Sequence, residues 1–451
     1  MTTGRASNAF LAMPGPECYL LGRTGPFTQL TLDQHQPPPG FENYQGLLHL
    51  ETMKAAASLL PLPTLLAPLP QCVKSIDTPK ESGLPILLSR EDVAIGKVVR
   101  NQEGAEIVSQ LLAADASATP LVVTSLLPDL PFLASHPHGA GVISDLFEAC
   151  RRAPDHGAST IPALTRRLQG SLLRLTRDRW GCRVMQAALE DAAPDFQQAF
   201  ANELQGKALK LCQHLHANFV LQKYVELVPA SSAGFLLEEL TPHAMEVAVH
   251  VYGCRVLQRL IEHCPREPQL ASLLESVLSA VPQIEKLLKD PFGSNVLRAV
   301  VAYGSDSQVK AIMAAISTNV LKFAKHKHAS LVFERCLEAS SERSGDFPER
   351  DMLVALLLGD GTSRAPLAQV LLDRFGNYLA QRMIHCCKSE EEPRVLNLLA
   401  RCLPKLQRSP QGRHITIAAQ KRFGCMPGVP GNIGMSAQAS GRPSANLGAQ
   451  A

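Results

Sequence analysis

The segment HVYGCRVLQRLIE, residues 250–262, decides the fold because the chain repeats it. Each copy has a glycine or an alanine at its fourth position. The other copies are DRWGCRVMQAALE (178–190), HLHANFVLQKYVE (214–226), DPFGSNVLRAVVA (290–302), HKHASLVFERCLE (326–338) and DRFGNYLAQRMIH (373–385). Their small residues lie 36, 36, 40, 36 and 47 residues apart. A period near 36 with occasional insertions indicates an α-solenoid whose repeating unit is a few short helices.

Helical geometry divides each copy into two faces. Counted from the small residue, positions 3, 4 and 7 lie on one side of a helix that turns 100° per residue. These positions are apolar in nearly every copy, as Val256, Leu257 and Leu260 illustrate. Positions 1, 2 and 5 lie on the other side, and they are the positions that vary. We therefore expect stacked helices that bury one face and display three variable residues from each repeat.

The variable triplets have side chains that suit an exposed nucleic-acid base. Positions 1 and 5 are mostly small or amide groups, which can hydrogen-bond a base edge, and position 2 is mostly flat and can stack on a base. The six triplets are Cys182/Arg183/Gln186, Asn218/Phe219/Gln222, Cys254/Arg255/Gln258, Ser294/Asn295/Arg298, Ser330/Leu331/Glu334 and Asn377/Tyr378/Gln381.

These triplets closely resemble those of the Pumilio (PUF) family of RNA-binding repeat proteins, and the resemblance extends over residues 95 to 425. It implies an all-α fold, a right-handed curved α-solenoid of about eight three-helix repeats with flanking half-repeats. Two weaker copies, at Gly104 and Gly139, complete the eight, and residues 403–423 resemble the family's terminal half-repeat. We expect an RNA-binding domain over 86–426 between a Pro-rich, disordered or loosely ordered region 1–85 and a disordered tail 427–451.

The resemblance also implies which base each triplet binds. Cys with Gln resembles the family's adenine reader, and Asn with Gln resembles its uracil reader. The ionised carboxylate of Glu334 only accepts hydrogen bonds, which matches the two donors on the edge of guanine. Since family members bind RNA antiparallel to the chain, the repeat of Asn377 meets the 5′ base.

The repeat of Ser294 and Arg298 departs from the family's commonest pattern. Arginine cannot accept a hydrogen bond, whereas cytosine presents two adjacent acceptors, so we expect cytosine here. Alternatively, Arg298 contacts a phosphate and leaves the base unread. The predicted core is therefore 5′-UGCAUA-3′, or 5′-UGUAUA-3′ if Arg298 is silent.

The two upstream copies lack base-reading side chains. Their triplets, Ala105/Glu106/Ser109 and Ala140/Gly141/Ser144, contain neither a stacking plane nor a long amide. We expect them to add little specificity for the 3′ bases.

Four of the copies carry a basic residue at the border of the variable face. These residues are Lys223, Arg259, Arg335 and Arg382. The sequence leaves two interpretations open, contact with RNA phosphates or ordinary solvated helix charges.

Composition excludes several other classes of protein. The 44 basic and 41 acidic residues give a net charge of only +3, so the chain is not a polycationic nucleic-acid coat. The 12 cysteines are scattered and include no CxxC, which favours reduced thiols over a metal or disulfide framework.

Histidines such as His214 and His326 precede the repeated helices, where other copies have aspartate, so we expect them to cap helices. We expect no catalytic residue, no metal and no cofactor.

The resulting hypothesis is a cytoplasmic, monomeric protein that binds single-stranded messenger RNA in untranslated regions. By family resemblance it would repress its target messages through protein co-repressors, without a membrane or an enzymatic step. Two alternatives remain at this point. One is a divergent nucleolar PUF-like protein of ribosome biogenesis, and the other is a protein-binding scaffold of HEAT or armadillo type.

Overall fold

The computed structural model describes residues 95–152, 154–342 and 347–424, without the side chains of 154–158 and 340–342. These ranges belong to one compact unit, and all of their regular elements are helices. The expected all-α class is confirmed. The Pro-rich region 1–85 and the tail 427–451 lie outside the described residues, so their boundaries stay predictions.

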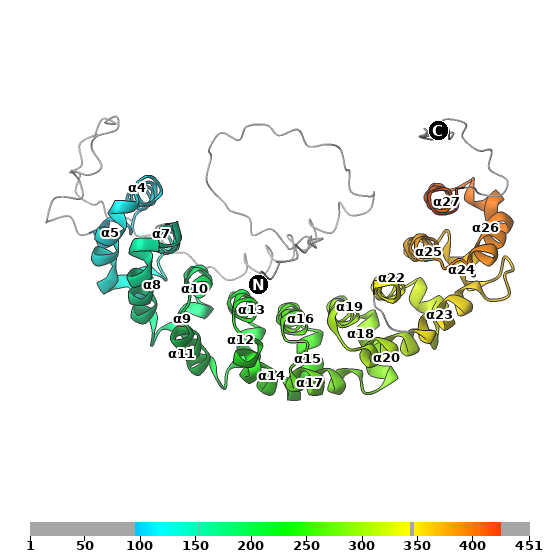
Figure 1. The fold of residues 1–451 in the computed structure, drawn as a ribbon, viewed down its shortest axis with the longest axis horizontal. Coiled ribbons are helices and arrows are strands. Elements are labelled where there is room, and N and C mark those ends of the chain that lie inside the picture. The colour runs from blue at the N-terminus through cyan, green and yellow to red at the C-terminus, as the bar shows by residue number, and fades with distance from the viewer. Residues whose placement is uncertain (1–94, 153, 343–346, 425–451) are drawn as a thin grey trace, which may run out of the picture. The chain divides into compact units, whose positions relative to one another are not determined.

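The helices of this unit form three rows (Figure 1). The repeated segments make up the inner row, each helix of which packs against the next one. Its members are α4 (Gln102–Ala114), α7 (Gly139–Arg152), α10 (Gly181–Glu190), α13 (Ala217–Leu227), α16 (Gly253–His263), α19 (Gly293–Tyr303), α22 (Ala329–Glu342), α25 (Gly376–His385) and α27 (Pro410–Phe423).

A short helix precedes each of the first eight inner helices, and an outer helix follows it. The short helices are α3 (Ile95–Val98), α6 (Leu130–Leu133), α9 (Leu172–Arg177), α12 (Ala208–Cys212), α15 (Ala244–Ala248), α18 (Val281–Lys289), α21 (Val320–Ala324) and α24 (Pro366–Val370). The outer helices are α5 (Thr119–Leu126), α8 (Pro154–Leu168), α11 (Pro194–Leu204), α14 (Gly234–Leu240), α17 (Pro268–Leu278), α20 (Asp306–Ser317), α23 (Pro348–Leu358) and α26 (Glu392–Leu406). The 3₁₀ turns η1 (Ala116–Ala118), η2 (Leu127–Asp129), η3 (Ala230–Ala233) and η4 (Thr241–His243) connect some of them. The described residues thus contain eight three-helix repeats followed by α27.

The terminal half-repeat differs slightly from the sequence prediction. Residues 403–406 are the last turn of α26, which is the outer helix of repeat 8. The half-repeat itself is α27, which packs against α25 and α26. It covers the last inner helix, as the end of a solenoid requires.

The core follows the positions that the repeated segments predict. Val220, Leu221 and Tyr224 of α13 are fully buried, as are Val256, Leu257 and Leu260 of α16. Full burial of one such aliphatic side chain contributes roughly 1.5–3 kcal/mol. Because every repeat contributes the same three positions, the core continues from one repeat to the next.

The small residue in each copy allows the inner helix to approach the short helix before it. A Cβ atom added to Gly181 would lie 2.8 Å from the backbone oxygen of Leu175. Ala217 and Ala329 hold this position in repeats 4 and 7 and are fully buried. Larger side chains are excluded because the two backbones are in near contact.

Each inner helix is capped by its own side chain, which belongs to the residue three positions before the small residue. Asp178 Oδ1 accepts two backbone N–H groups at 2.8 and 2.6 Å, and His214 Nδ1 accepts two at 3.1 and 3.3 Å. The equivalent caps are Asn101, His136, His250, Asp290, His326, Asp373 and Ser409. The predicted capping role of the histidines is confirmed.

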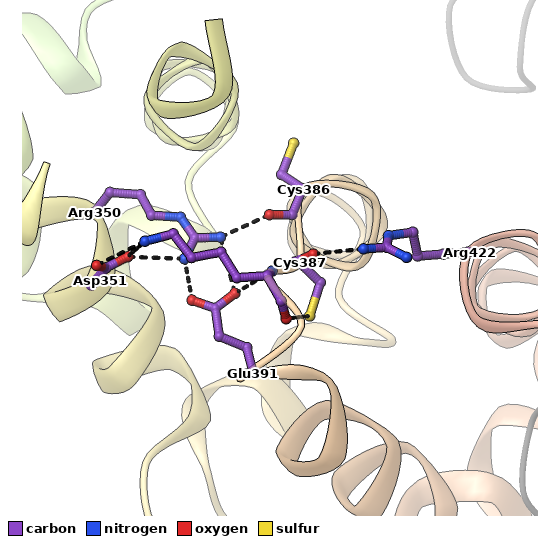
Figure 2. Close-up of polar contacts among 7 residues, drawn as sticks. Arg350, Asp351, Cys386, Cys387, Glu391 and Arg422 are labelled. Carbon is purple, nitrogen blue, oxygen red and sulfur yellow. Dashed lines mark hydrogen bonds and ion pairs between the residues drawn. The ribbon is translucent and has the colours of Figure 1, made fainter. Parts of the chain in front are cut away.

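A buried charge cluster joins the last repeats (Figure 2). Arg350 of α23 forms a two-pronged ion pair with Glu391, which stands immediately before α26, and donates to the backbone oxygen of Cys386 at 2.8 Å. Arg422 of α27 donates to the backbone oxygen of Cys387 at 2.9 Å. Repeat 7, repeat 8 and the terminal helix are therefore connected by charge-assisted hydrogen bonds as well as by apolar packing.

One described stretch, residues 116–133, has the length and the mean hydropathy, 1.2, of a membrane span. It is divided among η1, α5, η2 and α6, and a proline lies in the first turn of each of the last three. Both α5 and α6 pack against α7 and α8. Its buried apolar side chains, such as Leu126 and Leu133, belong to the core of repeats 1 and 2, whereas Leu121 and Phe132 are exposed.

Candidate nucleic-acid interface

The six triplets lie on six successive helices of the inner row, α10, α13, α16, α19, α22 and α25. Their three positions differ in exposure. The first position is buried in all six, with an exposed fraction between 0% for Asn218 and 5% for Cys182 and Asn377. The second is exposed or half-buried, and the third is half-buried. The helical-wheel expectation of three displayed residues therefore holds for the second and third positions only.

The first position is buried because the capping turn folds back on the start of the helix. Asn218 Nδ2 donates to the backbone oxygens of His214 and Leu215 at 2.8 and 2.9 Å. Asn377 repeats this arrangement with the two equivalent carbonyls of its own turn, at 2.8 and 3.1 Å. These bonds hold the side chain in one orientation, because each would have to break before the amide could rotate.

The four glutamines at the third position adopt one conformation. Each Nε2 donates to the backbone oxygen of the first triplet residue, at 3.0 Å for Gln186, 2.9 Å for Gln258, and 3.3 Å for both Gln222 and Gln381. This bond fixes the amide beside the first position. The four repeats thus present equivalent amides along the row.

The glutamines of the Asn/Gln triplets and those of the Cys/Gln triplets differ in their hydrogen bonds. In the Asn/Gln repeats the glutamine Nε2 additionally donates to the asparagine Oδ1, at 3.1 Å for Gln222 and 3.2 Å for Gln381. In the Cys/Gln repeats the partner is a thiol, which donates to its own turn instead, as Cys182 Sγ does to Arg179 at 3.3 Å. Burial raises the pKa of Cys182 and of Cys254 to about 11, so both are neutral thiols. The two classes therefore offer different polar edges.

The second position supplies exposed flat or apolar groups in most repeats. Tyr378 is 43% exposed and Leu331 is 41% exposed, although both are large apolar side chains. Arg183 and Arg255 are also exposed, and Phe219 is half-buried. Side chains of this kind at a regular spacing can each contact the face of a base.

Asn295, the second residue of the repeat 6 triplet, corrects the expectation of a freely displayed side chain at this position. It is half-buried, and its Nδ2 donates to the backbone oxygen of Pro291 at 3.0 Å. The physical reason is that the short amide reaches back one helical turn and satisfies a carbonyl of the capping turn, which a helix start leaves available. Repeat 6 therefore offers a small, tethered amide where the other five have a larger side chain, and contact of Asn295 with RNA stays a prediction.

Glu334 is the least satisfied polar group of the row. Its Oε1 is buried and makes no hydrogen bond to any described residue. Burial raises the pKa of this carboxyl to about 7, against the opposing charges of Arg382 and Arg298. An unpartnered buried acceptor is costly, so a ligand with hydrogen-bond donors is the expected complement.

Arg298 lies within electrostatic reach of Glu334. Burial lowers the pKa of Arg298, and the charge of Glu334 acts in the opposite direction. Repeats 6 and 7 thus place a donor-only side chain next to an acceptor-only side chain.

The four basic border residues form ion pairs, three of them between repeats. Lys223 Nζ lies 2.9 Å from Glu190 Oε1, Arg259 Nε lies 2.9 Å from Glu226 Oε1, and Arg382 Nε lies 2.8 Å from Glu338 Oε1. The fourth, Arg335, pairs with Glu338 within its own helix at 3.2 Å. The glutamates recur at the ninth position after the small residue, a signal that our sequence analysis missed. The border is therefore a ladder of ion pairs rather than a row of uncommitted cations.

The inner helices of repeats 1 and 2 have no comparable groups. Ala105, Ser109 and Ala140 are buried, and Ser144 Oγ donates to the backbone oxygen of Ala140 at 2.9 Å. Gly141 faces open space. These helices continue the row without side chains that can read a base.

The part of the chain that the structure describes has neither a metal site nor a disulfide bond. It holds no cluster of three His, Cys, Asp or Glu side chains that could bind a metal ion. None of its nine cysteines forms a disulfide bond. We find no donor set there for a metal cofactor.

Comparison with known proteins agrees with this geometry. Six segments match the sequence model of the Pumilio-family RNA binding repeat, namely residues 171–205, 207–241, 243–278, 283–317, 319–344 and 368–399. The chain belongs to the Pumilio family. Each match contains one triplet-bearing inner helix, so the repeats of the sequence, the structure and the family coincide. The HEAT or armadillo alternative is therefore wrong.

Individual relatives within the Pumilio family share little sequence identity with this chain. A Pumilio domain-containing protein of Schizosaccharomyces pombe is 23% identical over 154 residues, which are 34% of this chain and 21% of that protein. The match thus spans about a fifth of the relative's length.

Solved Pumilio structures superpose on most of the chain. The Puf3 RNA-binding domain bound to a recognition sequence from the Cox17 RNA 3′ UTR (site A) has a TM-score of 0.64 at 22% identity, covering 76% of this chain and 97% of that one. PUF-8 in complex with PBE-RNA has a TM-score of 0.63 at 23% identity, covering 74% and 96%. At this identity the likeness shows the fold, and it confirms the expected solenoid.

Proposed function

We propose that this protein binds single-stranded RNA sequence-specifically, one base per repeat, along helices α10 to α25 of the inner row. The observation that carries the proposal is the repeated geometry of the triplets. Six successive helices place a polar group beside an exposed or half-buried second residue, and the polar groups differ between repeats in what they donate and accept. Uniform amides would give affinity without sequence discrimination, whereas varied edges can distinguish bases.

The proposed core is 5′-UGCAUA-3′, from repeat 8 to repeat 3. The polar edges support uracil at the Asn/Gln repeats and adenine at the Cys/Gln repeats. Guanine at repeat 7 would supply the donors that buried Glu334 Oε1 lacks, and cytosine at repeat 6 would accept from Arg298. The solved relatives with this fold carry 3′ UTR RNAs, which supports the same class of ligand here.

The wider biological role follows from this binding activity. We propose that the protein marks messenger RNAs through their untranslated regions and represses them in the cytoplasm, as a monomer that recruits protein co-repressors. Reporter messages with an intact or a scrambled core, compared with and without the protein, test the repression step separately from binding.

Selection of binders from random RNA with the purified full chain tests the proposed function. We expect enrichment of a six-base motif that begins with UG and ends with AUA. A parallel selection with Glu334→Ala should lose the guanine and keep the flanking bases, because only the repeat 7 acceptor is removed. Enrichment of no motif, or of RNA hairpins without a shared sequence, would overturn the proposal and favour the divergent, structure-binding alternative.

A further inference from the structure

A basic surface lies beside the inner row at repeats 3 and 4, and base reading does not use it. We call it the α9–α12 edge, and it consists of the exposed cations Arg174, Arg177, Arg179, Lys207 and Lys210. Neither α9 nor α12 contains an acidic residue. Three carboxylates adjoin the two helices, and each is committed to backbone N–H groups: Asp178 at the start of α10, Glu203 at the start of α9 and Glu239 at the start of α12. This local excess of charge contrasts with a net charge of only +3 for the whole chain.

The edge directly adjoins the triplet residues. A shallow depression of about 400 Å³ is lined by Leu173, Arg174, Arg177, Asp178 and His214. Two of these, Asp178 and His214, cap α10 and α13, and the backbone oxygen of His214 holds the Asn218 side chain at 2.8 Å. The depression therefore lies where α10 and α13, the inner helices of repeats 3 and 4, begin.

Two kinds of basic residue make up the edge. Arg174 donates to Ser135 Oγ at 2.6 Å and to the backbone oxygen of Pro131 at 2.8 Å. Lys207 donates to the backbone oxygens of Glu203, in the last turn of α11, and of Gln205. Arg177 and Lys210 make no hydrogen bond or ion pair with any described residue. Arg177 also contributes, after burial, to the lowered pKa of His214, which indicates a positive potential at the depression.

The inner helices of repeats 1 and 2 have no side chains that would favour binding of RNA beyond repeat 3. Repeats 1 and 2 carry buried Ala105, Ser109 and Ala140 at reading positions, and Glu106 is an exposed acidic group among them. An RNA backbone is repelled by such a carboxylate and attracted by clustered cations.

We propose that RNA downstream of the read core leaves the inner row at repeat 3 and binds by its phosphates to the α9–α12 edge. This inference rests on the proposed function, which places the 3′ end of the core at repeat 3. The contacts are to phosphates, so they add affinity without adding sequence preference.

The test compares three RNAs by fluorescence anisotropy with the full chain: the core alone, the core with ten 3′ nucleotides, and the core with ten 5′ nucleotides. We expect the 3′ extension to tighten binding about tenfold at low salt, at roughly threefold for each of two phosphate contacts. Changing the sequence of the extension should leave the gain unchanged. The gain should shrink as salt is raised.

The decisive variant is Arg177→Glu with Lys210→Glu, which should abolish the gain from the 3′ extension while core-only binding stays within about threefold. The matched control is Lys286→Glu with Lys322→Glu, an equal charge change on the exposed short helices of repeats 6 and 7, which should keep the gain. A 3′ gain that survives in the first variant, or no gain in the native chain, would overturn the proposal.

The same measurements distinguish failure of the α9–α12 edge proposal from failure of the proposed function, which is sequence-specific RNA binding. Failure of the core-only RNA to bind with sequence preference refutes the proposed function, whereas normal core binding without a 3′ gain refutes only the edge. Binding of a polyglutamate peptide to the native chain but not to the Arg177→Glu, Lys210→Glu variant, with no 3′ gain, would assign the edge to an acidic protein and also overturn it.

Discussion

Arg350 and Glu391 form a buried ion pair that links α23 to the start of α26 across 41 residues of sequence. The Arg350 side chain is 1% exposed and that of Glu391 is 11% exposed, and Arg350 NH2 lies 3.0 Å from Glu391 Oε2. The glutamate also accepts from the backbone N–H of Lys388 at 2.9 Å. The contact between repeats 7 and 8 thus includes a buried ion pair, whereas the inter-repeat pairs at the border of the inner row are more exposed (Figure 2).

Glu391→Gln should destabilise the C-terminal repeats by about 3–5 kcal/mol, because it removes the buried counter-charge of the Arg350 guanidinium and leaves only Asp351, which is 43% exposed. Urea unfolding followed by circular dichroism measures the change. Lys388→Ala is the matched control, since its ion pair with Asp351 joins side chains that are 45% and 43% exposed and contributes at most about 1 kcal/mol. Equal losses from the two variants would contradict the assigned role of the buried pair.

The histidine caps should make folding sensitive to mild acid. His136, His214, His250 and His326 accept backbone N–H groups through Nδ1, which only a neutral imidazole can do in this orientation. Burial lowers the pKa of each of the four from its ordinary value near 6.5. Their contribution is therefore complete above about pH 6.5 and is lost as the pH falls toward the lowered folded pKa.

Replacing all four cap histidines by aspartate tests this dependence, because repeats 3, 6 and 8 already use aspartate at the same position. Between pH 7 and pH 5 the free energy of unfolding should fall less in the variant than in the native chain. Identical slopes over this range would show that the histidines do not set the acid sensitivity.

Binding of guanine should depend on pH through Glu334. Its pKa is raised to about 7, and the guanine donors require the ionised form. Affinity for the core should therefore be close to its maximum at pH 8 and about tenfold weaker at pH 6, because at pH 6 the carboxyl must release a proton before it can bind guanine. Glu334→Gln should remove this dependence and leave the remaining pH response of the protein unchanged. A native chain with the same affinity at both pH values would argue against carboxylate recognition.

Glu334→Gln combined with Ser330→Asn should change the preferred second base from guanine to uracil. The new pair reproduces the residues of the repeat in which Gln222 Nε2 lies 3.1 Å from Asn218 Oδ1. Discrimination between the two bases should shift by about tenfold or more in competition binding. Leu331 is unchanged and serves as the internal control for stacking. An unaltered base preference would mean that the triplet positions are assigned incorrectly.

Ser294→Asn with Arg298→Gln should likewise change the third base from cytosine to uracil. Arg298 can only donate, whereas the glutamine that replaces it can also accept the N3–H group of uracil. Competition binding with the two third-base variants measures the change, and Asn295 is kept in both proteins so that the second position stays constant. Equal binding of both RNAs by the native chain would instead show that Arg298 leaves the base unread.

Much of this architecture was predictable because it depends on local periodicity. The spacing of the small residues and the apolar positions such as Val256 and Leu257 fixed the helices, the buried face and the number of repeats. The cap histidines were predictable for the same reason, since they alternate with Asp178, Asp290 and Asp373 in an otherwise constant segment.

The exposure of individual triplet residues was less predictable. A helical wheel places Asn218 and Asn295 on the displayed side, but the amide of each is bonded to carbonyls of the capping turn. The partners of border cations such as Lys223 were harder to predict, because the glutamate of each inter-repeat pair recurs at a fixed position but belongs to the preceding repeat.

The sequence by itself determined the fold class, the repeat register and the chemistry of the triplets, because each repeat packs only on its neighbours and obeys one short pattern. The tertiary structure alone decided which polar atoms are left unpaired and which charges are shared between repeats. Three features depend on side chains that the fold brings together from different helices. They are the unpaired Oε1 atom of Glu334, the Arg350–Glu391 ion pair and the α9–α12 edge. Their energies follow from burial and distance in three dimensions, which a one-dimensional pattern does not contain.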